Sequence, residues 1–191
     1  MGANLARLAA FDDDNALRVV VESPRGSTLK LEYDPDQRLF TVSRSLPLGL
    51  AYPFDWGFVP GTVASDGDPV DALAIHQASS YPGVVLPCRI LGMVELDEHT
   101  GIGKKREVNN RIIATPAWHE SLKALTEARD LPASIRDELE HFFVAATAFT
   151  GKKIRIRGWA SCRATQRFIK SCELRPGESD TAGGAPGRGK K

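Results

Sequence analysis

Short stretches of alternating apolar and polar residues dominate the chain from residue 17 to residue 115. In one of them Leu29, Leu31 and Tyr33 occupy every second position, so their side chains share one face of an extended strand. β-Branched residues are frequent in these stretches, and residues that favour turns separate them. The pattern predicts strands over 17–22, 28–33, 38–44, 56–60, 70–76, 85–96 and 111–115, with one more over 152–158.

Helical spacing of apolar residues appears only after Pro116. It predicts a helix that includes Leu122 and Ala128, a second helix that follows Pro132 and extends to Ala146, and a third over 161–173. Many strands followed by a few helices, without regular β-α-β alternation, are typical of a mainly β member of the α+β class. We expect a small antiparallel barrel or sheet with helices packed outside it.

The charge of the chain is nearly balanced, with 25 lysine and arginine residues against 24 aspartate and glutamate residues. A net charge of +1 gives no broad basic field, so we expect neither a nucleic acid nor a membrane surface as partner. No apolar run approaches the roughly 20 residues that cross a bilayer. Cys88, Cys162 and Cys172 show no C-x-x-C spacing, which favours reduced thiols and a cytoplasmic location.

A chain of 191 residues is long enough to bury a core without disulfides or a structural metal. We expect one domain over 17–174, preceded by an N-terminal extension over 1–16. Residues 175–191 contain five glycines, two prolines and no large apolar residue, so we expect a disordered tail with a basic end there.

The densest acidic group consists of Asp66, Asp68 and Asp71, three carboxylates within six residues. Gly67 permits a tight backbone path and Pro69 favours an extended Asp68, so the three side chains are able to converge on one point. Their mutual repulsion is costly without a cation, and oxygen ligands of this kind suit Mg²⁺ or Mn²⁺. The alternative interpretation is an Asx-rich turn, in which the aspartates accept hydrogen bonds from nearby backbone amides.

Charged residues on the neighbouring predicted strands support the metal interpretation. Lys30 and Glu32 alternate on one strand face, Glu22 ends the strand before, and Arg44 ends the strand after. Taken singly, each is more often a surface residue. Together they provide what a metal-chelated phosphate requires, namely anionic ligands for the metal and cations for the phosphoryl oxygens.

With these residues the chain resembles the soluble family I inorganic pyrophosphatases. Their signature D-x-D-P-x-D is matched by Asp66, Asp68, Pro69 and Asp71. The likeness is co-linear from about residue 17 to about residue 174, and it includes Glu22, Lys30, Glu32, Arg44, Tyr52-Pro53, Gly57, Pro87 to Gly92, Phe142-Phe143 and Gly158-Trp159.

The resemblance implies a closed antiparallel five-stranded β-barrel of the OB type with flanking helices. It also implies hydrolysis of pyrophosphate to two orthophosphates with several Mg²⁺ ions, for which Mn²⁺ is a possible substitute, and assembly into homo-oligomers.

By position in the family pattern, Asp68 orients and deprotonates the attacking water, while Asp66 and Asp71 hold metal. Glu32 and Glu22 are implied as ligands of metal or of metal-bound water. A third acidic stretch supplies either Asp97 or Glu98, depending on a one-residue gap. The implied substrate-binding residues are Lys30, Arg44, Tyr52 and Arg111.

Several positions depart from the family pattern. Trp56 stands where the family has tyrosine, Asn109 where it has an acidic ligand, and Arg111 where it has lysine. The Tyr-Lys pair that follows the Phe-Phe dipeptide is replaced by Ala146 and Thr147. Losing one charged phosphate contact costs about 1.5–3 kcal/mol, or about ten- to a hundredfold in binding. Lys152 or Lys153 is a possible replacement for the missing contact, although both are better interpreted as exposed charges on a strand.

Three functions follow as hypotheses. The first is Mg²⁺-dependent hydrolysis of pyrophosphate. The second is hydrolysis of a bulkier phosphoanhydride or phosphate ester, admitted where Ala146 and Thr147 leave one side of the site open. The third is a degenerate, non-catalytic homologue that binds metal or phosphate or acts as an interaction subunit. Retention of Asp68 favours chemistry, because a metal-binding module requires no positioned general base.

Overall fold

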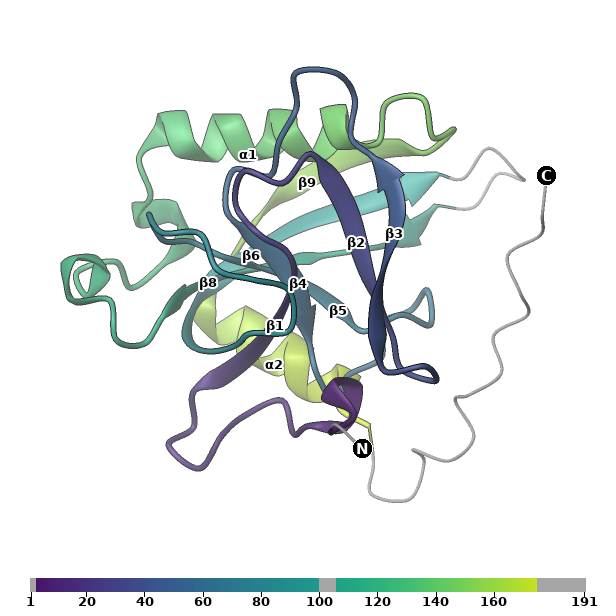
Figure 1. Ribbon diagram of the computed structural model, residues 1–191. Helices are drawn as coiled ribbons and strands as arrows, with labels where there is room; N and C mark the ends of the chain where they lie inside the picture. The colour runs from purple at the N-terminus through teal and green to yellow at the C-terminus, as the bar shows by residue number, and fades with distance from the viewer. Residues whose placement is uncertain (1–2, 100–105, 175–191) are drawn as a thin grey trace.

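The computed structural model describes residues 3–99 and 106–174 (Figure 1). Within these residues, strands run over β1 (Leu17–Ser23), β2 (Leu29–Asp34), β3 (Leu39–Ser45), β4 (Asp55–Val59), β5 (Val70–Ala74), β6 (Val85–His99), β7 (Glu107–Val108), β8 (Arg111–Pro116) and β9 (Lys153–Ser161). The helices are α1 (Ala133–Ala146) and α2 (Cys162–Cys172), with short 3₁₀ turns η1 (Leu5–Arg7), η2 (Glu120–Leu122) and η3 (Ala128–Asp130). The protein is therefore mainly β with two helices.

Five strands form a cycle of pairings, because β1 pairs with β4, β4 with β5, β5 with β8, β8 with β6, and β6 again with β1. The β5–β8 pair is parallel and the other four are antiparallel. The expectation of an entirely antiparallel arrangement is therefore wrong. The reason is that five is an odd number. Strand direction cannot alternate all the way around a cycle of five strands, so at least one neighbouring pair must run parallel.

Close approach of β1 and β4 depends on one glycine. A Cβ atom added to Gly57 would lie 1.8 Å from the carbonyl oxygen of Val20 on the facing strand, so no larger residue fits without moving the backbone. This accounts physically for a glycine in the middle of an otherwise fully buried strand.

The hairpin β2–β3 forms a separate two-stranded sheet that lies in front of the larger sheet in Figure 1. Its register places Lys30 directly opposite Arg44 and Glu32 opposite Thr41, with an irregularity after Lys30. Charged side chains that are far apart in the sequence thus become neighbours across two strands. The expected strands at 28–33 and 38–44 are confirmed.

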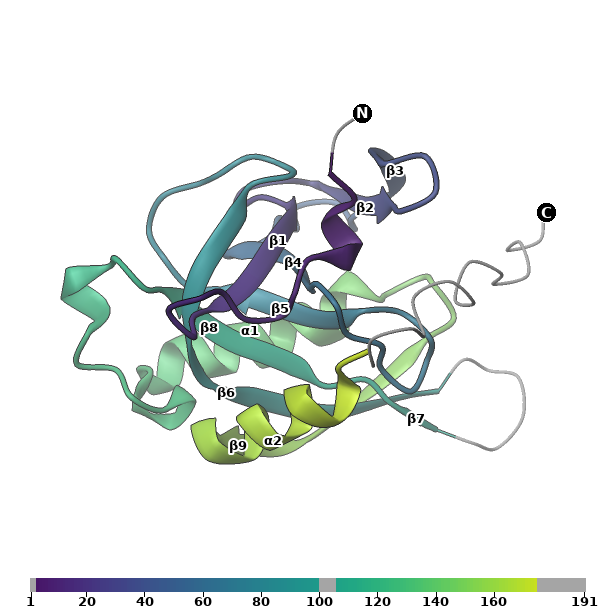
Figure 2. The same cartoon turned by 90° about the horizontal axis from the view of Figure 1, so that it is seen from below.

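The two helices cover different apolar clusters. Helix α2 lies along β6 (Figure 2), and its Ile169 is fully buried with residues of β1, β5 and β8. Helix α1 contacts β9 and buries Leu139, Phe142 and Phe143 in a second cluster. Each fully buried side chain of this size contributes roughly 1.5–3 kcal/mol of burial free energy. The second cluster also fixes the end of α1 beside the hairpin, and this end borders the site.

The helices expected after Pro132 and over 161–173 are confirmed, but the helix expected between Pro116 and Ala128 is wrong. The structure has only the turns η2 and η3 there. Arg89 explains the difference, because its guanidinium donates 2.9 Å hydrogen bonds to the carbonyl oxygens of Leu122 and Leu125. Those carbonyls are therefore satisfied by a side chain rather than by a continuous helical ladder.

The expected N-terminal extension packs against the domain, since Ala10 is buried and its carbonyl oxygen accepts a 2.8 Å hydrogen bond from the Arg18 amide. The tail expected over 175–191 lies outside the described residues. Among the residues that are described, no helix has the length and apolar character needed to cross a membrane.

Candidate active site

A cavity of about 310 Å³ opens between the β2–β3 hairpin, the end of α1 and the larger sheet. Nine of the eleven residues expected at the site line it: Lys30, Glu32, Arg44, Tyr52, Asp66, Asp68, Asp71, Glu98 and Arg111. Glu22 and Asp97 do not line it. The cavity therefore gathers acidic and basic side chains from segments spread over most of the chain.

The three aspartates approach the cavity from the loop before β5 and from β5 itself. Gly67 adopts a left-handed φ of 89°, which forms the turn between Asp66 and Asp68. The Asp66 side chain accepts a hydrogen bond from the Asp68 amide at 3.2 Å, so the Asx turn is present. All three carboxylates still line the cavity. Turn formation and cavity lining thus occur together, and the two interpretations of this segment do not exclude each other.

Burial and like charge act on two of these carboxylates. Desolvation raises the pKa of Asp66; the hydrogen bond from the Asp68 amide opposes this effect, and the negative charge of Asp68 adds to it. Burial also raises the pKa of Asp71, although the positive charges of Arg111 and Lys30 oppose this. Both carboxylates therefore favour a bound cation, because a cation stabilises the ionised form that burial disfavours.

Arg111 is the central cation of the cavity and is 6% exposed. Its guanidinium forms an ion pair with Asp71, a second with Glu98 at 3.1 Å, and a hydrogen bond with the side-chain oxygen of Asn109. The guanidinium carbon also lies 5.1 Å from the centre of the Trp56 ring. Trp56 thus keeps the aromatic surface at its position and contributes a cation–π contact with Arg111.

The hairpin contributes two further cations. The Lys30 ammonium lies 2.5 Å from a carboxylate oxygen of Glu32. The Arg44 guanidinium donates a 2.8 Å hydrogen bond to the carbonyl oxygen of Ala146 at the end of α1. That contact links the hairpin to α1 and holds Arg44 at the rim of the cavity.

Sequence reasoning underestimated Lys152. Its ammonium lies 2.7 Å from the second carboxylate oxygen of Glu98, and the residue lines the cavity. Of the two interpretations of Lys152, the less favoured one, in which it reaches into the site, agrees with this position, although 41% of its side chain is exposed. The alternation of β9 alone gives no signal for this contact, because Lys152 precedes the strand in a loop.

The choice between Asp97 and Glu98 depends on which face of β6 each side chain occupies. Successive residues of a strand point to opposite faces, and Glu98 is the one that faces the cavity. Asp97 instead contacts Arg106 and lies 3.1 Å from each of Arg155 and Arg157. Desolvation acts to raise the pKa of Asp97, but the hydrogen bonds and positive charges of Arg106 and Arg155 together lower it below its ordinary value. The negative charge of Asp97 is therefore balanced by arginines outside the cavity.

Glu22 lies behind the cavity rather than on its wall. Its carboxylate oxygen accepts a 2.8 Å hydrogen bond from the Tyr33 amide of β2. Burial raises the pKa of Glu22 to about 8. In this position the carboxyl group supports the strand that carries Lys30 and Glu32.

Comparison with known proteins identifies the family of the chain. The family model described as inorganic pyrophosphatase matches residues 19–175. The chain belongs to the inorganic pyrophosphatase family. It is 33% identical to the inorganic pyrophosphatase of Thermus thermophilus over 177 residues, which covers 91% of this chain and 98% of that protein. It is 38% identical to the inorganic pyrophosphatase of Aquifex pyrophilus over 157 residues, covering 80% of this chain and 84% of that one.

A solved structure of the family has a similar fold. The crystal structure of the Thermus thermophilus inorganic pyrophosphatase superposes with a TM-score of 0.81 at 32% sequence identity, covering 89% of this chain and 97% of that chain. The family fold therefore extends over nearly the whole described chain.

The cavity wall at the end of α1 is uncharged. Ala146 and Thr147 line the cavity but bring no charge to it, and Asn109 brings an amide bound to Arg111. Among the described residues, no three His, Cys, Asp or Glu side chains are gathered closely enough to hold a metal ion. The donor chemistry nevertheless fits a hard divalent cation, because Glu32, Asp66, Asp68 and Asp71 present oxygen atoms to one cavity.

Proposed function

We propose that this chain is a Mg²⁺-dependent inorganic pyrophosphatase, which hydrolyses pyrophosphate to two orthophosphates. The observation that carries the proposal is the meeting of Asp66, Asp68 and Asp71 with Lys30 and Arg44 around one cavity. Family membership supports the same reaction and a divalent metal cofactor.

In the proposed site, Asp66 and Asp71 hold Mg²⁺, with Glu32 and Glu98 as further acidic ligands and Mn²⁺ as a substitute. Bound divalent cations lower the pKa of a coordinated water and neutralise charge on phosphoryl oxygens. Asp68 orients the attacking water and accepts its proton. The carboxylate of Asp68 is exposed to solvent, so water reaches it directly. Asp97 leaves the proposed ligand set because it does not line the cavity and its carboxylate is held by arginines outside it.

The basic residues bind the phosphates. Lys30 and Arg44 contact phosphoryl oxygens from the hairpin, and Tyr52 and Arg111 complete the proposed substrate-binding set. Lys152 supplies a cation on the side where Thr147 has no charge. Charge-assisted contacts to phosphate are the strong hydrogen bonds of such a site.

We further propose that the five-strand cycle closes as an OB-like barrel, with 17–174 as one domain. Assembly into a homo-oligomer and a cytoplasmic location are proposed from the family pattern and from the free thiols of Cys88, Cys162 and Cys172.

The test is orthophosphate release from pyrophosphate with excess Mg²⁺ and, separately, Mn²⁺, beside a chelator control and the Asp68→Asn variant. Metal-dependent release that disappears in Asp68→Asn supports the proposal. Folded protein that releases no more orthophosphate than Asp68→Asn with either metal overturns it and favours a non-catalytic, phosphate-binding homologue.

A further inference from the structure

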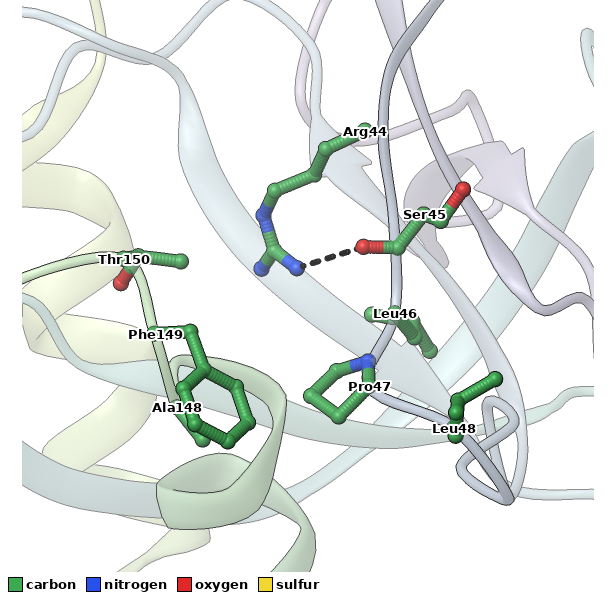
Figure 3. A pocket seen from close by; sticks show the side chains of 8 residues that line it. All are labelled: Arg44, Ser45, Leu46, Pro47, Leu48, Ala148, Phe149 and Thr150. Carbon is green, nitrogen blue, oxygen red and sulfur yellow. Dashed lines mark hydrogen bonds between the residues drawn. The ribbon is translucent and has the colours of Figure 1, made fainter.

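A second, shallower groove of about 390 Å³ lies beside the cavity (Figure 3). One wall is the loop after β3, with Leu46, Pro47 and Leu48, and the facing wall is the loop after α1, with Ala148 and Phe149. Leu48 and Phe149 are fully exposed to solvent. Large apolar side chains facing each other across an open groove are a feature of ligand and partner sites.

This groove adjoins the candidate active site. Arg44 and Thr150 line both hollows. The Arg44 guanidinium is held at the junction by hydrogen bonds to the carbonyl oxygens of Ser45, at 3.3 Å, and Ala146, at 2.8 Å. A ligand that binds Arg44 through a phosphate therefore has the apolar groove directly next to it.

The α1 side of the junction, opposite Arg44, carries only small side chains. Ala146 and Thr147 form the cavity wall nearest to the groove, and neither extends a long side chain across the opening. Pyrophosphate itself has no group that would occupy the apolar groove. An organic group attached to a phosphate at Arg44 would lie next to the groove that Phe149 lines.

The backbone holds Phe149 in an uncommon conformation. Its φ of 67° lies in the left-handed region, which large side chains rarely adopt. Hydrogen bonds from Ala148 to the carbonyl oxygen of Ala145 and from Thr150 to that of Thr147 fix the surrounding turn. Burial of the ring does not offset this conformation, because the ring is in solvent. Strain of this kind at an exposed aromatic residue points to a binding role.

We infer that the groove binds the aromatic organic group of a nucleoside-diphosphate-like phosphoanhydride, whose two phosphates occupy the cavity. The inference rests on the proposed function and names a further substrate class for the same site. Two observations favour this occupant: the basic junction at Arg44 matches a phosphate, and the exposed ring of Phe149 is able to stack on a planar base.

The corresponding reaction is balanced without a further reagent. The oxygen of water attacks the terminal phosphorus, and the bond from that phosphorus to the bridging oxygen breaks. The bridging oxygen leaves with the electron pair as part of the nucleoside monophosphate, and Asp68 accepts the proton of the water. With ADP the products are AMP and orthophosphate.

The experiment compares three substrates with excess Mg²⁺ and the full chain: pyrophosphate, ADP, and methyl diphosphate, which has the same phosphoanhydride but no ring. The variants are Phe149→Ala and, as a matched control, Trp118→Ala, which removes an exposed aromatic side chain that lines neither hollow. We expect Phe149→Ala to lower kcat/KM for ADP about tenfold through KM and to change the other two less than twofold. Trp118→Ala should change none of them.

Two results overturn the inference. One is an equal effect of Phe149→Ala on all three substrates, and the other is cleavage of pyrophosphate without any ADP cleavage above Asp68→Asn. If no substrate is cleaved, the proposed function fails, and calorimetric binding of ADP and methyl diphosphate to Asp68→Asn decides the inference separately. Tighter binding of ADP that Phe149→Ala abolishes supports it, whereas equal binding overturns it. Phe149→Ala that changes the sedimentation coefficient but not ADP binding assigns the groove to a second copy of the chain and also overturns it.

Discussion

Replacement of Arg111 by methionine tests whether this residue balances the negative charge of the cavity when no metal is bound. The guanidinium contacts the carboxylates of Asp71 and Glu98, and Arg111 and Glu98 are nearly inaccessible to solvent. Methionine keeps much of the length of the side chain but leaves both carboxylates without this partner. Removing one member of a buried ion pair costs about 3–5 kcal/mol. Because 26% of the Asp71 side chain stays exposed, we expect the lower end, about 3 kcal/mol.

For a chain of this size, 1 kcal/mol corresponds to a shift in Tm of about 2–4 °C. Arg111→Met should therefore melt about 6–12 °C lower than the parent protein in the presence of a chelator. Mg²⁺ should raise the Tm of the variant more than that of the parent, because the released carboxylates become available to the cation. The control Arg163→Met changes an exposed arginine of α2 and should shift Tm by less than about 2 °C.

Thermal denaturation followed by circular dichroism, with chelator and then with excess Mg²⁺, measures both effects. A loss of less than about 2 °C for Arg111→Met in chelator would show that the ion pairs contribute little to stability. An equal Mg²⁺-induced rise in variant and parent would refute the idea that Arg111 and the metal share the same carboxylates.

Three other predictions concern binding, packing and pH. Lys152→Met should raise the KM for pyrophosphate about tenfold, because a charged contact is worth about 1.4 kcal/mol or more, whereas Lys153→Met should leave KM within twofold in the same orthophosphate assay. Leu139→Ala should lower the free energy of urea unfolding by about 2–5 kcal/mol, whereas Val144→Ala, on the exposed face of the same helix, should lower it by less than about 1 kcal/mol; similar losses would contradict the packing of α1. The raised pKa of Glu22 predicts that metal-free protein loses stability as pH rises from about 4.5 to about 8, since the unfolded carboxyl ionises first. Glu22→Gln should remove part of this decline in urea unfolding across that range, and an unchanged slope would contradict the raised pKa.

Local patterns were sufficient to predict most of the fold. Alternation over Leu29 to Tyr33 depends only on neighbouring residues, and the strand β2 follows from it. The helix expected near Leu122 failed because its carbonyl groups are bound by Arg89, a residue more than thirty positions away. No local sequence pattern predicts that contact. The parallel β5–β8 pair likewise depends on the order in which strands meet and not on the composition of either strand.

The proximity of the three aspartates to one another followed from one short motif. Asp66, Asp68 and Asp71 line one cavity, as expected from their spacing. The choice of Glu98 over Asp97 required the orientation of β6, which a one-residue gap in the family pattern leaves open. The position of Lys152 required the turn after α1, whose course is set by tertiary packing.

The central claim is that the aspartate cluster performs metal-dependent hydrolysis, and orthophosphate release from pyrophosphate tests it most directly. The parent protein should release orthophosphate with Mg²⁺, chelator should stop the release, and Asp68→Asn should reduce it at least a hundredfold, as expected for loss of a general base. Equal release by the parent and by Asp68→Asn, or none from folded parent protein with Mg²⁺ or Mn²⁺, would contradict the claim.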